Sequence, residues 1–169
     1  LNIIAFSSCV EGMFFYGAFA YVYFLRSKGL LPGLADGTNW VFRDETMHMN
    51  FAFEVVDIAR KESPGLFTTH VQSEVYAMID SAIEAEYQFA KDALSGGVAG
   101  LSANDMKQYL QYVGDQRLAR LGLEQRYNAK NPFPFMEHQG VMPLANFFER
   151  RVSEYAVNVT GEVRFDEEF

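Results

Sequence analysis

The sequence predicts an all-α fold, and three observations carry that prediction. Apolar residues recur at helical spacing through most of the chain, no stretch alternates as a strand would, and no internal repeat is present. The 169 residues are 49% hydrophobic and 15% aromatic. That apolar content is enough for the core of one domain and too high for a disordered chain.

Charge and cysteine content exclude several classes of protein. The chain carries 14 Lys and Arg against 22 Asp and Glu, a formal charge of −8, and so lacks the basic surface that nucleic acid requires. The single cysteine, Cys9, excludes an internal disulfide framework and suits a reducing compartment. The first residues have no basic n-region and no small-residue cleavage site, so we expect no secretion signal. We therefore expect a cytoplasmic protein, and the missing initiator methionine suggests a fragment or a processed piece.

The first helix is expected over residues 1–25, an apolar run with one charge, Glu11. About 20 apolar residues suffice to cross a bilayer, but this run is rich in Gly, Ser and Tyr and no second span follows. A carboxylate in mid-span would cost roughly 2.5–3.5 kcal/mol, and the mean hydropathy of the chain is −0.08. We therefore expect the central helix of a bundle and no membrane.

The second and third helices follow between glycine- and proline-rich turns. Gly29 ends the first helix, and Pro32 can occupy the first turn of the second, where its missing N–H is not needed. The second helix runs to about Lys61, and the third spans about residues 71–94 at helical apolar spacing.

The fourth helix is expected to begin after Ser102, an N-cap with Asp105 three residues on, and to reach about Asn128. Residues 131–135 read Asn-Pro-Phe-Pro-Phe and predict an irregular break. A short helix is expected over residues 144–153, and no helical period follows it.

Three polar side chains stand where solvated charge is not expected. Glu11 lies within the apolar first helix, and Glu45 and His48 lie three apart on one face of the second. Glu11 precedes the turn at Gly29 by 18 residues and Glu45 follows Pro32 by 13, which correspond to about 27 Å and about 20 Å of helix. If the turn absorbs the difference, the two helices hold Glu11 opposite Glu45 and His48.

Buried carboxylates must be paired, neutralised or bound to a metal. A Glu-x-x-His motif with a lone Glu from a neighbouring helix is half the ligand set of a carboxylate-bridged dimetal bundle. Carboxylates with one imidazole suit iron or manganese better than zinc. The alternatives are a chance Glu-x-x-His motif and, for Glu11, a protonated or hydrogen-bonded core carboxyl.

Several stretches resemble the small subunits of class I ribonucleotide reductase. Residues 42–53 resemble the family's helix that carries arginine, aspartate, glutamate, two further residues and histidine, and the 34 residues from Glu11 to Glu45 also fit the family. The other similar stretches are residues 9–16, 28–34, 131–136 and 146–152 and the acidic tail that ends in Phe169. The similarity covers nearly the whole chain and implies a ferritin-like helical bundle.

By this resemblance the chain holds the carboxy-terminal half of a dinuclear metal centre, with Glu11, Glu45 and His48 as ligands. The metals would be two irons, with manganese or a mixed manganese/iron pair as alternatives. Asp44 would hydrogen-bond a ligand histidine on the radical-transfer route. Phe15 and Phe19 would form an apolar wall near the radical, or serve as plain core residues.

The resemblance also divides the chain into a helical part, residues 1–153, and a flexible acidic tail, residues 154–169, that docks on the large subunit. Tyr155 would relay the radical to that subunit with Glu149 as its partner, although a tyrosine in a polar tail is usually a surface residue. The docking residues would be Phe165, Asp166, Glu167, Glu168 and Phe169.

The family places a second Glu-x-x-His, an aspartate ligand and usually a radical tyrosine amino-terminal to this segment. Glu-x-x-His occurs once here, so we expect a fragment or a split subunit whose amino-terminal half completes the centre, and the isolated chain should bind no stoichiometric metal pair. The complete subunit would be a homodimer that generates an oxidising radical for the large subunit of ribonucleoside-diphosphate reductase. The alternatives are another ferritin-like dimetal oxidase or oxygenase and a helical structural module without metal.

The remaining polar residues are expected to be structural. His70 and His138 have no carboxylate at ligand spacing, and Cys9 is expected to be a small buried residue. The solvated face of the third helix is expected to carry Glu84, Glu86, Lys91 and Asp92.

Overall fold

The structure is a computed structural model that describes residues 1–137. The first segment is one continuous helical rod made of α1 (Asn2–Ala5), the π-helix η1 (Phe6–Phe14) and α2 (Phe15–Ser27). The elements after it are α3 (Pro32–Glu62), the 3₁₀ turn η2 (Pro64–Leu66), α4 (Thr69–Ala93), α5 (Ala103–Arg120) and α6 (Pro134–Glu137). The all-α prediction is confirmed, since these 137 residues contain one isolated β-bridge, between Val98 and Leu101, and no strand.

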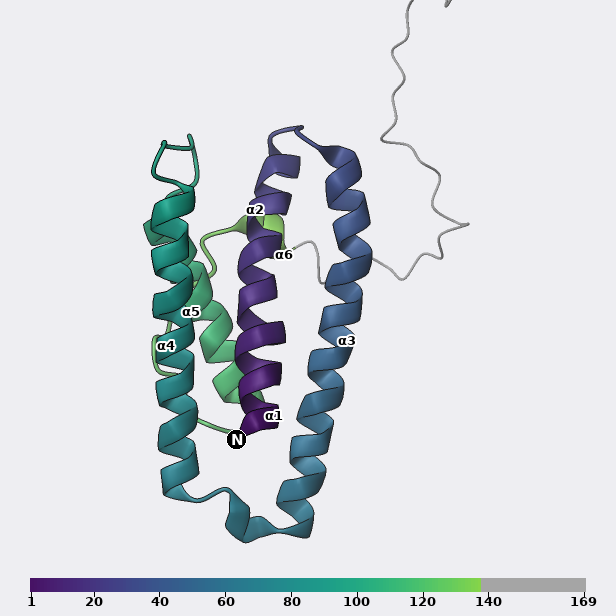
Figure 1. Ribbon diagram of the computed structural model, residues 1–169, viewed down its shortest axis with the longest axis vertical. Helices are drawn as coiled ribbons and strands as arrows, with labels where there is room; N and C mark the ends of the chain where they lie inside the picture. Colours follow the sequence, from purple (N-terminus) through teal and green to yellow (C-terminus); the bar gives the residue numbers. More distant parts are fainter. Residues whose placement is uncertain (138–169) are drawn as a thin grey trace, which may run out of the picture.

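The rod lies in the middle of the molecule, with α3 on one side and α4 and α5 on the other (Figure 1). Met13 and Ala20 of the rod are completely buried, and Tyr23 is 1% exposed. Asn2–Ser27 is also the one described helix that is long and apolar enough to cross a membrane, and 56% of its apolar window is buried inside the protein. The rod therefore packs as the central helix that its sequence predicts.

The predicted helix starts are confirmed in detail. Gly29 adopts a φ of 73° after the rod, Leu31 is also left-handed with a φ of 49°, and Pro32 opens α3. At α5 the Ser102 hydroxyl accepts a hydrogen bond from the Asp105 amide, and the Asp105 carboxylate accepts one from the Ser102 amide. This reciprocal capping box satisfies two amides that a helix start leaves unpaired.

The predicted end of the fourth helix is wrong, because α5 ends at Arg120 and not near Asn128. Gly122 takes a φ of 71° and donates its amide to the Ala119 carbonyl, while the Leu123 amide donates to the Leu118 carbonyl. This is a Schellman ending, in which a left-handed glycine lets two late carbonyls find donors.

A buried carboxylate holds the segment after α5 against that helix. Asp115 is 2% exposed, and its oxygens accept the backbone amides of Arg126, Tyr127 and Ala129 at 2.8, 3.0 and 3.1 Å. The chain is thereby turned back along α5 towards α6, whose Phe135 packs on Phe24 of the rod.

Asp115→Ala is expected to destabilise the protein by about 3 kcal/mol, because three backbone amides lose a charged acceptor in a buried position. Asp115→Asn, which keeps one acceptor oxygen, should lose about half of that. Equilibrium urea unfolding measures both changes, with the exposed neighbour Gln116→Ala as the control. A loss below about 1 kcal/mol for Asp115→Ala would show that water replaces the carboxylate.

Candidate metal centre

The π-helix η1 surrounds the first candidate ligand, Glu11. Such stretches are rare and frequently mark functional sites. Gly12 follows Glu11, and a Cβ at this position would lie 2.5 Å from the Ser7 carbonyl oxygen and 2.9 Å from Nε of Arg117. Only glycine therefore fits beside Glu11 without displacing backbone. The π-helix was not predicted from the sequence, where a lone glycine after the carboxylate is its one signal.

The structure brings Glu11, Glu45 and His48 together. Nδ1 of His48 lies 3.9 Å from a carboxylate oxygen of Glu11 and 3.6 Å from one of Glu45. One ligand atom from each of the three side chains lies within 4.8 Å of the others, and this is the one such cluster among residues 1–137. The predicted opposition of the first two long helices is thus confirmed.

The three side chains differ in exposure. The carboxylates of Glu11 and Glu45 are 10% and 16% exposed, whereas the imidazole of His48 is 53% exposed. The expectation that all three would be enclosed is therefore wrong for His48 within the described residues. The cluster opens on the side of its histidine.

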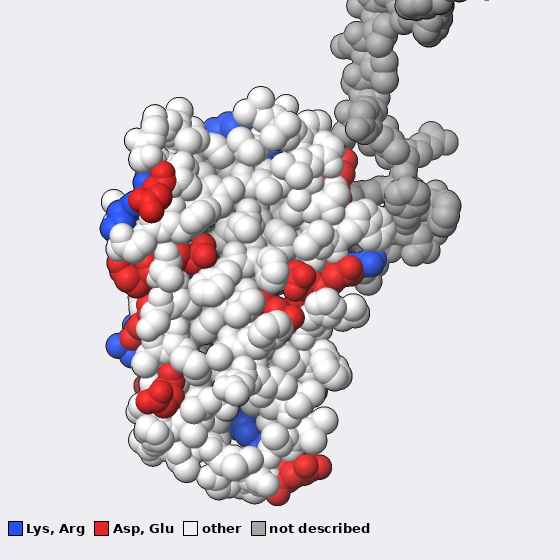
Figure 2. Space-filling view, viewed as in Figure 1, with Lys and Arg blue, Asp and Glu red and all other residues white. Residues whose placement is uncertain are grey.

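Apolar side chains of α3 are exposed on both sides of His48. Val41 lies seven residues before it and Phe51 three residues after it, and they are 45% and 71% exposed. Leu34, Met47 and Ile58 of α3 are also at least half exposed. Viewed as in Figure 1, carboxylates show at the surface between the rod and α3, and further acidic and basic side chains lie along the α4 edge and at the lower end (Figure 2).

The electrostatics of the cluster favour a cation. Burial raises the pKa of Glu11, the neighbouring charge of Glu45 raises it further, and only His48 lowers it. Two carboxylates that converge in a poorly solvated place repel each other unless a proton or a cation lies between them. Carboxylate oxygens with one imidazole nitrogen are donors that suit iron or manganese, so the residues present fit half of a dinuclear centre.

An aromatic cluster lies on the rod and α3, one to two helical turns along from Glu11 and Glu45. Phe19 is 4% exposed, and its ring centre lies 5.1 Å from that of Phe42 and 6.3 Å from that of Phe15. Tyr16 joins the same cluster. Phe15 itself remains 37% exposed, so of the two predicted wall residues only Phe19 is buried, and their role near a radical stays a prediction.

Of the remaining predicted site residues, Asp44 lies within the described part of the chain and the others lie outside it. Asp44 lies 3.4 Å from the guanidinium of Arg43 and is half exposed, so its bond to a ligand histidine stays a prediction. The predictions that fall outside the described residues concern the helix over 144–153, His138, Glu149, Tyr155, Phe165, Asp166, Glu167, Glu168 and Phe169.

Glu86 does not belong to the solvated face of α4, and that prediction is wrong. Glu84, Lys91 and Asp92 are exposed as expected. The Glu86 carboxylate instead turns towards Gly17 of the rod, where a Cβ would lie 2.7 Å from its oxygen. Burial raises the pKa of Glu86.

The raised pKa of Glu86 predicts a pH dependence with a definite sign. Below the unfolded-state pKa of about 4.3 the Glu86 carboxyl is protonated in both the folded and the unfolded state, so its burial does not lower the stability of the protein. As pH rises through the higher folded-state pKa, the unfolded state loses its proton first and stability falls. Glu86→Gln should therefore raise the thermal midpoint at pH 8 and leave it unchanged at pH 3.5, with Glu84→Gln as the exposed control. Equal shifts at both pH values would contradict this.

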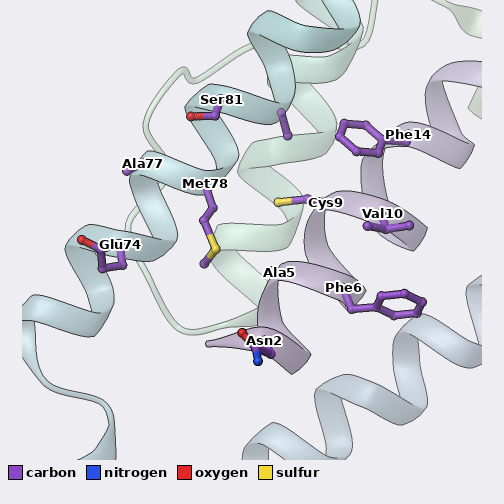
Figure 3. Close-up of a pocket in the computed structure, with 11 residues that line it drawn as sticks. Asn2, Ala5, Phe6, Cys9, Val10, Phe14, Glu74, Ala77, Met78 and Ser81 are labelled. Atoms are coloured by element: carbon purple, nitrogen blue, oxygen red, sulfur yellow. The ribbon is translucent and has the colours of Figure 1, made fainter.

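A separate groove lies between the rod and α4, with a volume of about 670 Å³. Cys9, Phe6 and Met78 are among the residues that line it (Figure 3). Burial raises the pKa of the Cys9 thiol to about 11, so at neutral pH it is a thiol and a poor nucleophile. The prediction that Cys9 is a buried residue is confirmed, and no candidate metal ligand lines this groove.

Comparison with known proteins gives matches that include the three candidate ligands. The family model for "Ribonucleotide reductase, small chain" matches residues 1–132. The chain is 36% identical over 155 residues to the ribonucleoside-diphosphate reductase subunit beta of Chlamydia pneumoniae, and 35% identical over 178 residues to the small chain from Nicotiana tabacum. These alignments cover 91% and 99% of this chain but 45% and 52% of the relatives. The chain thus spans about half the length of the curated relatives it matches.

Solved structures share the fold. The R2 subunit of ribonucleotide reductase from Clostridium botulinum matches with a TM-score of 0.73 at 24% identity, over 81% of this chain and 43% of that one. A class I ribonucleotide reductase structure from Bacillus halodurans matches with a TM-score of 0.75 at 23% identity, over 80% and 49%. These similarities support a ferritin-like helical fold.

Proposed function

Because this chain belongs to the ribonucleotide reductase small-chain family, we propose that it supplies half of a dinuclear metal centre in the small subunit of a ribonucleoside-diphosphate reductase. The observation that carries the proposal is the convergence of Glu11, Glu45 and His48 from two helices, with their ligand atoms within 4.8 Å. When bound, the metal pair would supply the oxidising equivalent that starts a radical.

The residues of this chain would have distinct roles around that centre. Glu11 and Glu45 would hold the metals through carboxylate oxygens and His48 through an imidazole nitrogen. Phe19 and Phe42, packed at 5.1 Å, would keep water from the site. This arrangement keeps the site dry on the side of the rod and leaves His48 open.

The open side of His48 is where the remaining ligands would enter. The exposed apolar residues of α3, including Val41 and Phe51, would be covered by the same segment. Its source would be the amino-terminal half of the small subunit, either in the same chain or as a separate polypeptide. The complete subunit would pair as a homodimer and act with a large subunit that binds the nucleotide.

The radical would leave the centre through Asp44 and then through Glu149 and Tyr155. The acidic carboxy-terminal tail, with Phe165 and Phe169 among its carboxylates, would dock on the large subunit. This part of the proposal is supported by the sequence resemblance.

The proposed route is tested by Tyr155→Phe in the full-length protein, by which we mean this chain together with the amino-terminal half of the small subunit, whether that half is joined to it or separate. The change removes only the phenolic O–H, so we expect the turnover of ribonucleoside diphosphates with the large subunit to fall at least about 100-fold while metal content stays at the wild-type level. The matched control is Tyr87→Phe, which makes the same change on α4, where the Tyr87 hydroxyl donates to Asn104. Turnover that survives Tyr155→Phe would remove this residue from the route.

A further inference from the structure

We propose that Arg117 is a positioning residue that fixes both ligand-bearing helices from outside the centre. It belongs to α5, which contributes none of the three candidate ligands. The role in metal binding rests on the proposed function. The helix-fixing role rests on the contacts of Arg117 alone.

The first contact holds the π-helix. Nε of Arg117 donates to the carbonyl oxygen of Gly12 at 3.1 Å, across 105 residues of sequence. Gly12 is the residue after Glu11, and its missing side chain leaves the space that the guanidinium occupies. A hydrogen bond from a charged donor is roughly twice as strong as a neutral one, so this contact restrains the backbone that carries the first ligand.

The second contact reaches α3 through Tyr16. The guanidinium carbon of Arg117 lies 4.6 Å from the centre of the Tyr16 ring, which is a cation–π contact. The Tyr16 hydroxyl in turn lies 2.9 Å from Oγ1 of Thr46, the residue after Glu45. The guanidinium is thus connected to a residue adjacent to each carboxylate ligand.

The direction of the hydrogen bond between Tyr16 and Thr46 is determined by a second bond of Thr46. Oγ1 of Thr46 donates its single hydrogen to the Phe42 carbonyl at 2.7 Å, so it accepts from the Tyr16 hydroxyl. The Tyr16 hydroxyl is thus the donor to Thr46, while the Tyr16 ring contacts the guanidinium of Arg117. Loss of the Arg117 guanidinium therefore removes the cation from the Tyr16 ring, and loss of the Tyr16 hydroxyl removes the donor to Thr46.

The guanidinium of Arg117 lies in a buried environment, where a charge is not expected without a structural role. Burial lowers the pKa of its guanidinium, while Tyr16, Tyr109 and Tyr112 raise it. A cation in such a place is costly unless its donors are used, and a plain core contact between α5 and the rod needs no charge. A site that requires ligands held in fixed positions does need such support.

The test compares two arginines of α5 in the full-length protein. Arg117→Gln removes the contacts with Gly12 and Tyr16. Arg120→Gln removes the same charge but breaks pairs with Asp57 and Glu54, which lie on α3 beyond the ligands. Hydrogen–deuterium exchange of the metal-free proteins and Co²⁺ affinity by calorimetry are measured for both.

We expect Arg117→Gln to raise exchange over residues 6–16 and 42–48 and to weaken Co²⁺ binding 10- to 100-fold. Arg120→Gln should leave both at the wild-type level. If both variants behave alike, the positioning role is wrong. If wild-type protein binds no Co²⁺, the proposed metal function fails, and the exchange data still decide whether Arg117 fixes the two helices.

Tyr16→Phe provides a milder variant if Arg117→Gln does not fold. It keeps the ring under the guanidinium and removes only the hydroxyl that hydrogen-bonds Thr46. Exchange should then rise over residues 42–48 and not over 6–14, and Thr46→Val should give the same pattern. Unchanged exchange over residues 42–48 in both variants would contradict the connection to α3.

Discussion

Replacing Glu11 by glutamine is expected to have opposite effects on the metal-free and the metal-loaded protein. Without metal, the buried Glu11 carboxylate faces the charge of Glu45, and both burial and that charge raise its pKa. A neutral amide of the same shape removes this repulsion, so the metal-free variant should unfold at a higher temperature than wild type at pH 8. With metal, the variant lacks a carboxylate ligand.

The loss of metal binding should be large. Mutation of a residue that only supports a ligand typically lowers metal affinity 10–100-fold. Loss of Glu11, a ligand itself, should therefore lower metal affinity at least about 100-fold. Thermal unfolding of the full-length protein with chelator and with added Mn²⁺ measures both effects. Glu62→Gln, an exposed change at the end of α3, should respond to Mn²⁺ as wild type does. The same Mn²⁺ response in Glu11→Gln would exclude Glu11 as a ligand.

Gly12→Ala is expected to destabilise the protein by about 2–3 kcal/mol, the upper range for an added methyl group in a packed core. The new Cβ would lie 2.5 Å from the Ser7 carbonyl oxygen and 2.9 Å from Nε of Arg117. The first of these atoms is backbone, so the π-helix must change to make room. Metal affinity should fall with stability, because the same backbone carries Glu11.

Gly37→Ala is the matched control for this change. Gly37 lies within α3, and a Cβ there would meet nothing within 4 Å. Alanine is the better helix former, so this variant should gain about 0.5–1 kcal/mol. Chemical denaturation with a constant m-value measures both variants. A gain in stability for Gly12→Ala as well would show that η1 relaxes to an ordinary α-helix without cost.

The sequence was sufficient to predict the helices and the meeting of the ligands because both depend on local rules. The turn at Gly29 and Pro32 and the capping box at Ser102 each depend on residues that are close together in sequence. The opposition of Glu11 and Glu45 follows from the fixed rise of a helix on either side of one turn. These predictions need no knowledge of which helix packs beside which.

The features that escaped prediction depend on contacts between distant segments. Most positions of η1 are apolar, so the sequence does not distinguish its i→i+5 bonding from that of an α-helix, and Gly12 is its one signal. Arg117 is 105 residues from the carbonyl it binds, and in sequence it is an ordinary arginine of a last helical turn. Glu86 turns inward only because Gly17 leaves room for it. The exposure of His48 depends on which other segments cover α3, and one helix's sequence does not specify them.

Metal analysis of the purified full-length protein after anaerobic loading with Fe²⁺ or Mn²⁺ tests the central claim most directly. Two ions per chain are expected for wild type, and none in a His48→Ala variant that remains folded by circular dichroism. The isolated 169 residues should hold no stoichiometric pair. Wild-type protein without bound metal, or a His48→Ala variant that keeps both ions, would contradict the assignment of Glu11, Glu45 and His48 as half of a dinuclear centre.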